Sequence, residues 1–449
     1  MELTPEQQQA VVNATRHKIS AMTGGAGCGK SFTSCEIARA WLQENANIKV
    51  LGLGPTGTSG DVLSASMSRL PSDLRAQVDV MTNAAFLTDV KVMRMVSDSN
   101  VRVILDEMSM NDVRTMWDIT STLNNVDRLV LVGDARQIPP VGGRGMFREL
   151  SMNDDVVPFV YLKRGFRQMA SAQKLKTAIK TLEENISKRS RTTVEELQHA
   201  DSEAAKADDD DSFYFMDLPG NAEEVPMDVL SSFAESEDPP QFLSVTNDTR
   251  IKGNKAIQKK INGGSQETLA TFGKRFRDFK YGDKVVSTGN VSVRDEVRGT
   301  KTRKFTNGSL GVIRRDMDVN SPYHLQTYIA YRVHDGNDFV ERRDYYNYMT
   351  NSFETSFDLA YFLTVDKAQG SGFRNVVFVF EAKRPGAELI YTAISRAQEA
   401  CVVVGNRNLF ATVTAQMQVM DEALLHAFQV RKAYAERAKN TRDAKQEED

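Results

Sequence analysis

The chain has 449 residues, of which 41% are hydrophobic and 26% charged, and this composition excludes a wholly disordered or fibrous protein. Lysine and arginine total 57 against 60 aspartate and glutamate residues, so the formal net charge is -3. This balance argues against a protein that coats nucleic acid permanently or binds membranes through a polybasic surface. The length indicates roughly two to four domains.

The cysteines and histidines are few and scattered. Three cysteines and five histidines show neither the spacing of a disulfide framework nor that of a zinc site, which fits a reducing compartment. No apolar run approaches the roughly 18 residues that cross a bilayer, and the first residues, MELTPEQQQA, lack the pattern of a signal peptide. The sequence therefore predicts a soluble, cytoplasmic protein with no membrane partner.

The first part of the chain alternates strand-like apolar runs with helical patterns. The runs cover residues 19–22, 50–53, 101–105 and 128–132. Strands that alternate with helices predict an α/β fold with a parallel sheet covered on both faces. We expect this first lobe to span residues 1–166, with a short insertion at about 83–100.

A glycine-rich loop follows the first apolar run. Residues 24–31 read GGAGCGKS and fit the pattern G-x-x-x-x-G-K-[ST] without a mismatch, between an apolar run and a helical pattern. In that context backbone N–H groups curl around phosphate oxygens, Lys30 contacts the β- and γ-phosphates, and Ser31 can ligate Mg²⁺. The predicted nucleotide site comprises Gly24, Gly25, Ala26, Gly27, Cys28, Gly29, Lys30, Ser31 and Phe32.

Two carboxylates, Asp106 and Glu107, directly follow the apolar run 101–105. The C-terminal ends of parallel strands are where such a sheet binds ligands. Asp106 is placed to hold Mg²⁺, and Glu107 to orient or deprotonate an attacking water. The pair alone is a weak signal, but with the phosphate loop it predicts an NTP hydrolase.

The middle of the chain is less regular. Residues 167–238 are polar with helical tendency, and we expect a linker region there. Its four consecutive aspartates, Asp208, Asp209, Asp210 and Asp211, indicate a solvated segment, because a metal site takes ligands from several elements.

A second lobe is expected over residues 239–275 and 355–425. Its apolar runs are 242–245, 361–364, 376–380 and 400–404, with a helical pattern at 388–397. Residues 276–354 read instead as a β domain inserted in this lobe, and Asn307-Gly308 between strand-like runs predicts a hairpin. Residues 426–449 are expected to form a charged tail.

One further segment makes a family resemblance specific. Residues 133–141 read GDARQIPPV, and GDxxQLPPV is motif III of superfamily 1 helicases of the RecD/Dda type. The chain resembles this family, superfamily 1B, over about residues 3–409, with the motifs in the family's order. The resemblance implies two RecA-like parallel-sheet lobes with a small SH3-like β domain inserted in the second. It also implies a monomeric, ATP- and Mg²⁺-dependent DNA helicase that moves 5′ to 3′.

The resemblance assigns nucleotide-binding roles by position. Gln7 matches the glutamine that reads adenine, and Gln137 matches the γ-phosphate sensor of motif III. Arg167 matches a γ-phosphate contact in motif IV, and Arg396 the arginine finger of motif VI. Gly370 of motif V is a further expected nucleotide contact. ATP would lie between the lobes, and the expected catalytic set is Lys30, Glu107, Gln137, Arg167 and Arg396.

The resemblance also implies DNA contacts, which are Pro55 and Thr56 in motif Ia, Thr246 and Asn247 in the second lobe, and Thr364 in motif V. The sequence departs from the family at three places, of which the first is residues 81–86, MTNAAF, which lack the usual Thr-Ile-His. Asp366 stands where motif V usually has His, and the segment 87–100 is short for the hairpin that separates strands. Met93 or Met95 would be its tip, but methionines are more often core residues.

Two alternatives stay open. The short segment 87–100 favours a single-stranded-DNA-stimulated ATPase or translocase that remodels protein–DNA complexes with little unwinding. A non-enzymatic module that uses ATP as a switch is the other, and Glu107, Gln137 and Arg396 argue against it. Replication, recombination and repair are not distinguished by the residues.

The expected partners are single-stranded and tailed duplex DNA, with a single-strand-binding protein or replisome component as candidates. A bacterial or phage-infected cell is the expected setting, from the compact size. We therefore interpret the near-neutral net charge as the sum of separate acidic and basic patches, and residues 252–260 are one of the basic clusters.

Overall fold

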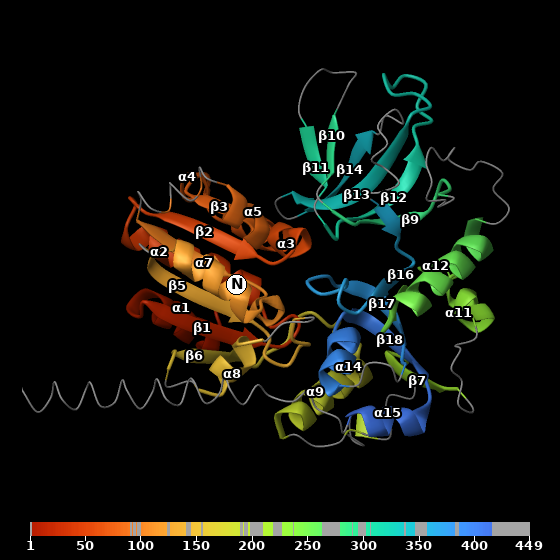
Figure 1. Ribbon diagram of the computed structural model, residues 1–449, viewed down its shortest axis with the longest axis horizontal. Coiled ribbons are helices and arrows are strands. Elements are labelled where there is room, and N and C mark those ends of the chain that lie inside the picture. Colours follow the sequence, from red (N-terminus) through yellow and green to blue (C-terminus); the bar gives the residue numbers. More distant parts are fainter. Residues whose placement is uncertain are drawn as a thin grey trace, which may run out of the picture. The chain divides into compact units, whose positions relative to one another are not determined.

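The computed structural model describes residues 2–89, 92, 96, 100–123, 126–140, 145–153, 156–188, 192, 196–197, 210–218, 227–236, 238–262, 279–289, 291–294, 302–305, 307–335, 338–345, 357–381 and 386–414. It divides into two compact units (Figure 1). The first comprises Met1–Pro55 and Leu70–Gly165, with Gln418–Asp449 outside the described residues. The second comprises Thr56–Arg69 and Phe166–Met417.

The first unit is built on a six-stranded parallel sheet of order β3-β2-β4-β5-β1-β6. Its strands are β1 (Ile19–Gly24), β2 (Lys49–Gly54), β3 (Val78–Thr82), β4 (Val101–Leu105), β5 (Val126–Gly133) and β6 (Phe159–Leu162). All four predicted runs are strands, so the expected parallel sheet is confirmed. The two strands that were not predicted, β3 and β6, form its edges, and each includes half-buried and exposed residues.

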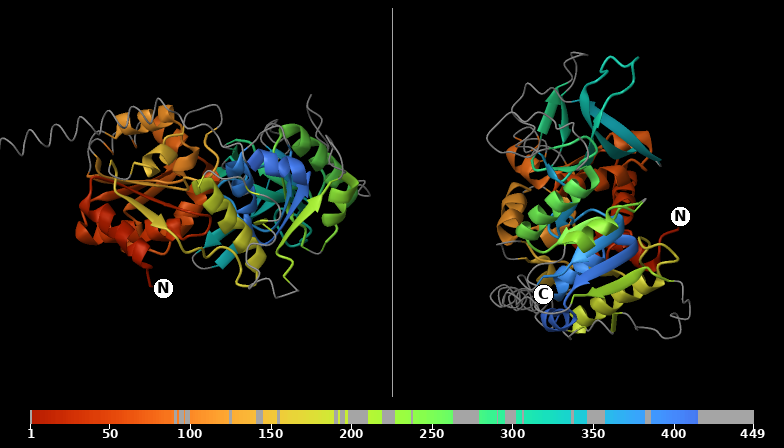
Figure 2. Two further views of the ribbon diagram at one scale, coloured as in Figure 1. Left: turned by 90° about the horizontal axis from the view of Figure 1, so that it is seen from below. Right: turned by 90° about the vertical axis from the view of Figure 1, so that its right-hand side faces the viewer.

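Helices cover both faces of this sheet. They are α1 (Pro5–Arg16), α2 (Lys30–Glu44), α4 (Ser72–Arg75), α5 (Asn83–Thr88), α7 (Val113–Thr122) and α8 (Phe147–Ser151), with a 3₁₀ turn η1 (Met108–Met110). The red helices α1 and α2 lie on one side, and the orange α5 and α7 on the other (Figure 2). In the segment 83–100, Val96 is fully buried in the core between sheet and helices, whereas Met93 and Met95 lie outside the described residues.

The second unit contains a five-stranded parallel sheet of order β16-β8-β17-β18-β7. Its strands are β7 (Phe213–Asp217), β8 (Gln241–Ser244), β16 (Phe362–Thr364), β17 (Phe373–Val379) and β18 (Ala397–Gly405). Its helices are α9 (Gln173–Lys188), α11 (Met227–Phe233), α12 (Asn247–Asn262), α14 (Ala387–Ile394) and α15 (Arg407–Thr414). The unit also takes in α3 (Gly57–Met67), which follows β2 in the chain.

The expectation of a linker over residues 167–238 needs correction. Helix α9 packs against α14 and buries an apolar stripe, and β7 pairs with β18 as the edge strand of the second sheet. The stripe is Leu175, Ala178, Ile179, Leu182 and Ile186. Its spacing of three and four residues is that of a helix face packed on a core, so this part of the stretch belongs to the lobe.

An antiparallel sheet of order β14-β13-β12-β9-β15 is inserted between α12 and β16. Its strands are β9 (Lys284–Ser287), β12 (Leu310–Arg315), β13 (Thr327–Asp335), β14 (Asp338–Tyr345) and β15 (Phe357–Leu359), and β10 (Val291–Arg294) pairs with β11 (Thr302–Phe305) separately. The hairpin predicted at Asn307-Gly308 is wrong, because β12 pairs with β9 and β13 and not with β11. Gly308, with φ +92°, instead turns the chain onto β9 by donating its N–H to Ser287 O. Whether this sheet is an SH3-like barrel stays a prediction.

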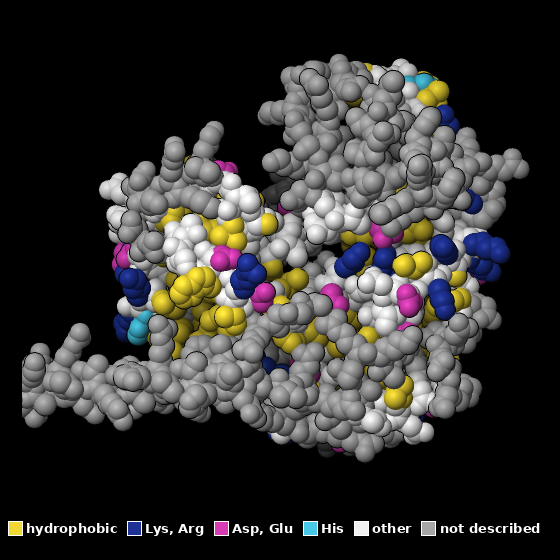
Figure 3. Space-filling view, viewed as in Figure 1, with side chains coloured by type: hydrophobic (Ala, Val, Ile, Leu, Met, Phe, Trp, Pro, Cys, Tyr) yellow, Lys and Arg dark blue, Asp and Glu magenta, His cyan; other side chains and the backbone are white. Residues whose placement is uncertain are grey.

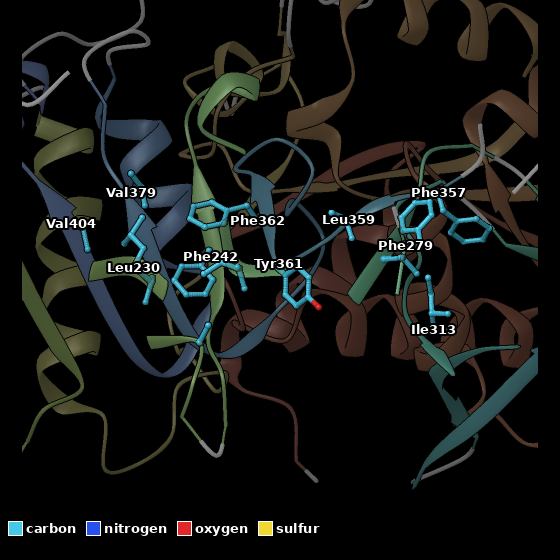
Figure 4. Packing of buried hydrophobic residues seen from close by; sticks show 14 of the residues in the cluster. Leu230, Phe242, Phe279, Ile313, Phe357, Leu359, Tyr361, Phe362, Val379 and Val404 are labelled. Carbon is cyan, nitrogen blue, oxygen red and sulfur yellow. The ribbon is translucent and has the colours of Figure 1, made fainter. Parts of the chain in front are cut away.

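One apolar core runs through both sheets of the second unit (Figure 4). Phe242 and Phe362 stack in the lobe sheet with ring centroids 4.8 Å apart, and Phe279 and Phe357 belong to the inserted sheet's side of the same cluster. Tyr361 lies between these two groups (Figure 4). The inserted sheet therefore does not have a separate core within the described residues.

Candidate functional site

The phosphate loop joins β1 to α2. Gly27 and Gly29 have φ of +77° and +79°, which glycine adopts without strain. A Cβ on Gly24 would lie 2.9 Å from Leu162 Cβ, so this backbone also passes too close to β6 for any side chain. Lys30 Nζ donates to the carbonyls of Gly24 and Gly25 at 2.8 and 3.0 Å, which curls the lysine back over the loop. Gly29, at the N-cap of α2, offers no side-chain oxygen to the first turn, and helix N-termini attract anions.

Asp106 and Glu107 stand at the C-terminal end of β4. The two strands next in the sheet, β5 and β1, lead to Gln137 and to the phosphate loop, so all three ends share one edge. Asp106 is buried, and Glu107 N–H donates to its Oδ1 at 2.8 Å. Burial and the neighbouring Glu107 charge raise the pKa of Asp106 to about 7, although that N–H and the Lys30 charge oppose the change.

Two acceptor atoms at this edge have no donor. Among the described residues, Glu107 Oε2 and Gln137 Oε1 are buried without a hydrogen-bond partner. Glu107 is also held at φ 49°, a left-handed conformation that non-glycine residues rarely adopt and that is enriched at functional sites. Because phosphate oxygens at neutral pH accept rather than donate, the donor that fits both atoms is water. The residues present therefore fit a hydrolytic nucleotide site.

Gln7 has a structural role beside its predicted one. It is buried at the N3 position of α1, and its Oε1 accepts from Thr4 N–H at 3.0 Å in a capping box. The capping box fixes the side chain, and its amide nitrogen is the group that remains to donate to an adenine acceptor.

The two predicted arginine contacts of the second unit lie against the same piece of backbone. Arg396 is 1% exposed, and it donates to Thr392 O at 3.0 Å, Ser371 O at 3.3 Å and Ser395 Oγ at 3.5 Å. Gly372 follows Ser371, and a Cβ on it would lie 3.7 Å from the guanidinium carbon of Arg167. Motif V thus ends between the two guanidinium groups.

The predicted DNA contacts of the second unit gather at the C-terminal ends of β8 and β16. Thr364 ends β16 and is buried, and Thr246 and Asn247 follow β8 and begin α12. Glu381, just after the adjacent strand β17, reaches the same place: Thr246 N–H and Thr246 Oγ1 donate to its Oε2 at 3.2 and 3.1 Å. Thr249 Oγ1 donates to its other oxygen. Sequence reasoning missed Glu381, whose signal, a carboxylate after an apolar run, was the one used for Asp106.

Motif V and motif Ia also meet within the second unit. Thr56 caps α3, and it exchanges hydrogen bonds with Ser59 at 3.1 Å in each direction, whereas Pro55 precedes it. Gly370, at φ +78°, lies beside this cap, because a Cβ on it would be 3.8 Å from Ser59 N. The preceding Gln369 was not among the predicted contacts. Its Nε2 is buried without a partner among the described residues, and it is a donor suited to a phosphate oxygen.

Charge on the second unit is concentrated where the sequence indicated. Dark blue side chains gather over α12 in the view of Figure 3. The exposed lysines of this helix are Lys252, Lys255, Lys259 and Lys260. Asp366, which replaces the usual His, is half-buried in the turn after β16, and its role stays a prediction.

Neither a membrane span nor a metal cluster is found in the described ranges. No helix there is long and apolar enough to cross a bilayer. No group of three or more His, Cys, Asp or Glu side chains there could hold a metal ion by itself. A Mg²⁺ bound by a hydroxyl, one carboxylate, water and nucleotide phosphates needs no such group.

Two protein-family models match this chain. One described as an AAA domain matches residues 2–210, and one described as a UvrD-like helicase C-terminal domain matches residues 359–404. The ATP-dependent RecD2 DNA helicase of Deinococcus radiodurans is 24% identical over 434 residues, which cover 94% of this chain and 52% of that protein. An uncharacterized protein of Methanocaldococcus jannaschii is 23% identical and covers 90% of this chain but 38% of its own length. The chain thus spans about half or less of these curated relatives.

Solved structures show the same fold. A Pif1 helicase from Bacteroides, in complex with ADP-AlF3 and ssDNA, aligns with a TM-score of 0.53 at 16% identity over 96% of this chain and 98% of that one. Pif1 helicase from Candida albicans gives a TM-score of 0.53 at 16% identity over 97% and 100%. The predicted fold class, α/β with two RecA-like parallel-sheet lobes, is confirmed.

Proposed function

We propose that this chain, which belongs to the superfamily 1B helicases, hydrolyses ATP with Mg²⁺ to move along single-stranded DNA and separate a duplex. The observation that carries the hydrolytic part is the pair of buried acceptors without donors, Glu107 Oε2 and Gln137 Oε1. They stand at the sheet edge that also carries the phosphate loop. A site that only held ATP as a switch would not need two acceptors for a water.

The residues divide the work as follows. Lys30 and the loop amides hold the phosphates, and Ser31 and Asp106 would hold Mg²⁺, which neutralises developing charge when bound. Glu107 positions and deprotonates the attacking water, and Gln137 orients it. Arg167 and Arg396 supply positive charge to the transferred phosphoryl group, a contribution worth about 10³–10⁵ in rate for an arginine finger.

The DNA part of the proposal rests on resemblance and on the second unit's sheet edge. Thr246, Asn247 and Thr364 lie at adjacent strand ends, and the lysines of α12 give that side positive charge. Contacts to phosphates carry no sequence information, so we expect sequence-independent, salt-sensitive binding. Solved Pif1 relatives include one bound to ssDNA and one that concerns DNA unwinding at forked dsDNA, which supports the proposal for this chain. The 5′ to 3′ direction comes from the family resemblance.

A tailed-duplex assay tests the proposal. We expect single-turnover unwinding of a duplex with a 5′ tail but not of one with a 3′ tail, and ATP turnover stimulated by single-stranded DNA. Lys30→Ala should abolish both activities, and the exposed Lys18→Ala serves as the matched control in the same unit. Equal turnover in wild type and Lys30→Ala would refute the hydrolase, and unwinding only from the 3′ tail would refute the direction.

A translocase that unwinds poorly is the second candidate. Val96 is fully buried and Val92 packs on the same core, so these two residues of the segment 87–100 point inward rather than forming part of a projecting pin. This alternative predicts DNA-stimulated ATP turnover and displacement of a bound protein block from single-stranded DNA, with little strand separation in the tailed-duplex assay.

We also propose that the chain acts as a monomer in the cytoplasm of a bacterial or phage-infected cell, with a single-strand-binding protein or replisome component as partner. The family resemblance supports this. Light scattering on DNA of one site length would show a single copy bound, and binding of two copies would contradict it.

A further inference from the structure

Helix α12 carries a ridge of polar residues on a face that is otherwise packed. The ridge consists of Arg250, Asn254, Gln258 and Asn262, spaced by four residues, so the side chains lie one above the other along the helix. Arg250 and Asn254 are buried. The exposed lysines of the same helix lie at other positions. Buried polar groups cost free energy unless each is hydrogen-bonded, so the partners of this ridge matter.

The first half of the ridge holds the strands by which the chain leaves the inserted sheet. Arg250 Nη1 donates to Asp358 Oδ2 of β15 at 2.7 Å. Asn254 then makes a two-way contact with the backbone of Phe362 in β16: its Nδ2 donates to Phe362 O at 3.0 Å, and Phe362 N–H donates to its Oδ1 at 2.9 Å. One strand belongs to the inserted sheet and the other to the lobe sheet.

The second half holds the place where the chain enters the inserted sheet. Asp283, fully buried just before β9, accepts from Gln258 Nε2 at 2.5 Å and from Asn262 Nδ2 at 2.6 Å. Lys280 N–H at 2.7 Å and the Tyr361 hydroxyl at 2.9 Å complete four donors for one carboxylate. Burial, with the Asp283 charge and hydrogen bond, raises the pKa of Tyr361 so that its hydroxyl stays a donor.

The ridge continues to the DNA-facing end of the helix. Arg250 Nε donates to Asn247 Oδ1 at 3.1 Å, and Asn247 is the first residue of α12. The residue predicted to contact DNA is therefore linked, through one arginine, to the inserted sheet. A buried ion pair adds little stability compared with apolar packing. We therefore explain these polar residues by the fixed position that they give α12 and the inserted sheet, and not by added stability.

We propose that Arg250, Asn254, Gln258 and Asn262, with Asp283 and Asp358, are positioning residues that make α12 and the inserted sheet move as one body. DNA held at Thr246 and Asn247 then carries the inserted sheet with it during each cycle, so strand separation is coupled to hydrolysis. The coupling part rests on the proposed function, whereas the rigid attachment does not.

The coupling of ATP hydrolysis to strand separation is tested by comparing the Arg250→Gln variant with the Arg102→Gln variant. Arg102 is the matched control, a buried arginine paired with Glu44 and Asp127 in the other unit. We expect Arg250→Gln to lower the base pairs unwound per ATP about tenfold, a change that the loss of a buried charged hydrogen bond can make in an equilibrium. Its DNA-stimulated kcat should stay within about twofold of wild type, the coupling being lost rather than the chemistry. Arg102→Gln should leave the ratio unchanged.

Exchanging the two members of the Arg250–Asp358 ion pair should restore part of the number of base pairs unwound per ATP. The double variant Arg250→Asp with Asp358→Arg should recover part of the ratio, whereas each single variant should not. An unchanged ratio in Arg250→Gln, or an equal loss in Arg102→Gln, would overturn the proposal. If wild type neither hydrolyses ATP nor unwinds DNA, the proposed function fails. The attachment of the inserted sheet to α12 is then decided by the hydrogen-exchange experiment below.

The attachment is tested without any activity. Hydrogen exchange at β9 and β15 should rise about tenfold in Tyr361→Phe, which removes one donor to Asp283 without leaving a buried charge unpaired, and more in Asp283→Asn. Exchange at β17 and β18 should stay unchanged. A uniform rise across the second unit, or no rise at β9 and β15, would show that the ridge does not fix the inserted sheet to α12.

Discussion

The candidate site residues of the two units differ in how far their hydrogen bonds are already made. In the first unit the functional edge leaves acceptors without donors, as Glu107 Oε2 and Gln137 Oε1 show. In the second unit Arg396, which precedes β18, already donates to three acceptors, and Thr246, which follows β8, donates to Glu381. The first unit's edge therefore has unused acceptors for a ligand, whereas Arg396 and Thr246 must exchange internal hydrogen bonds for bonds to a ligand. Substitutions should separate activity from stability in the first unit and join them in the second.

The largest expected effect is at Arg396. Arg396→Ala should lower DNA-stimulated kcat about 10³–10⁵-fold, as for other arginine fingers. It should also lower the free energy of unfolding by about 3–5 kcal/mol, because a buried charged side chain and its three hydrogen bonds are lost. Steady-state kinetics and urea unfolding measure the two effects. A variant that loses activity at full stability would break the comparison.

Glu107→Gln should give the opposite pattern in the first unit. We expect kcat to fall about 10²–10⁴-fold, since the general base is lost. Stability should be unchanged or slightly higher, because the amide removes the charge from a carboxylate whose buried Oε2 has no partner. Melting temperature and ATP turnover are compared with Lys18→Ala as the surface control. A clear loss of stability would mean that Glu107 supports the fold.

Asp106 predicts a pH dependence of stability. Its pKa is raised from 3.8 in the unfolded reference to about 7, so the folded state holds a proton that the unfolded chain has lost. The stability that this bound proton gives the folded state is fully present below about pH 4 and is lost as the pH rises through about 7. Asp106→Asn cannot ionise, so its stability relative to wild type should grow by about 2–4 kcal/mol from pH 4 to pH 7 without Mg²⁺. Urea unfolding at several pH values measures this, and a constant difference would contradict it.

The smallest expected effect is at Glu381. Its carboxylate occupies the Thr246 N–H and hydroxyl that we assign to a DNA phosphate. Glu381→Gln should tighten binding of single-stranded DNA about fivefold, since a competing charge is removed, and this gain should shrink at high salt. Fluorescence anisotropy at two salt concentrations measures the change. Weaker binding would show that Glu381 orients Thr246 for DNA instead of competing with it.

Features set by residues that are neighbours in the chain could be predicted from the sequence, whereas features set by residues far apart in the chain could not. The phosphate loop and the Asp106–Glu107 pair are short, contiguous patterns set by β1 and β4, which are continuous apolar runs. Edge strands such as β3 and β7 include half-buried and exposed residues, so a search for apolar runs missed them. The second unit's site depends on partners far apart in the chain, such as Thr246 with Glu381 at a separation of 135 residues. No local pattern reports such a pairing.

The insertion also dictates an order of folding. Strand β8 lies between β16 and β17 in its sheet and all four of its residues are buried, yet Gln241 meets Tyr361 only after the chain has run another 120 residues. During synthesis β8 therefore remains unpaired, with its apolar residues exposed, until the inserted sheet and then β16 and β17 have emerged from the ribosome. Such long-range closure is slow and favours aggregation of the waiting strand. A chain cut before residue 357 is expected to aggregate or remain bound to chaperones, even though its first unit retains every strand of its own sheet.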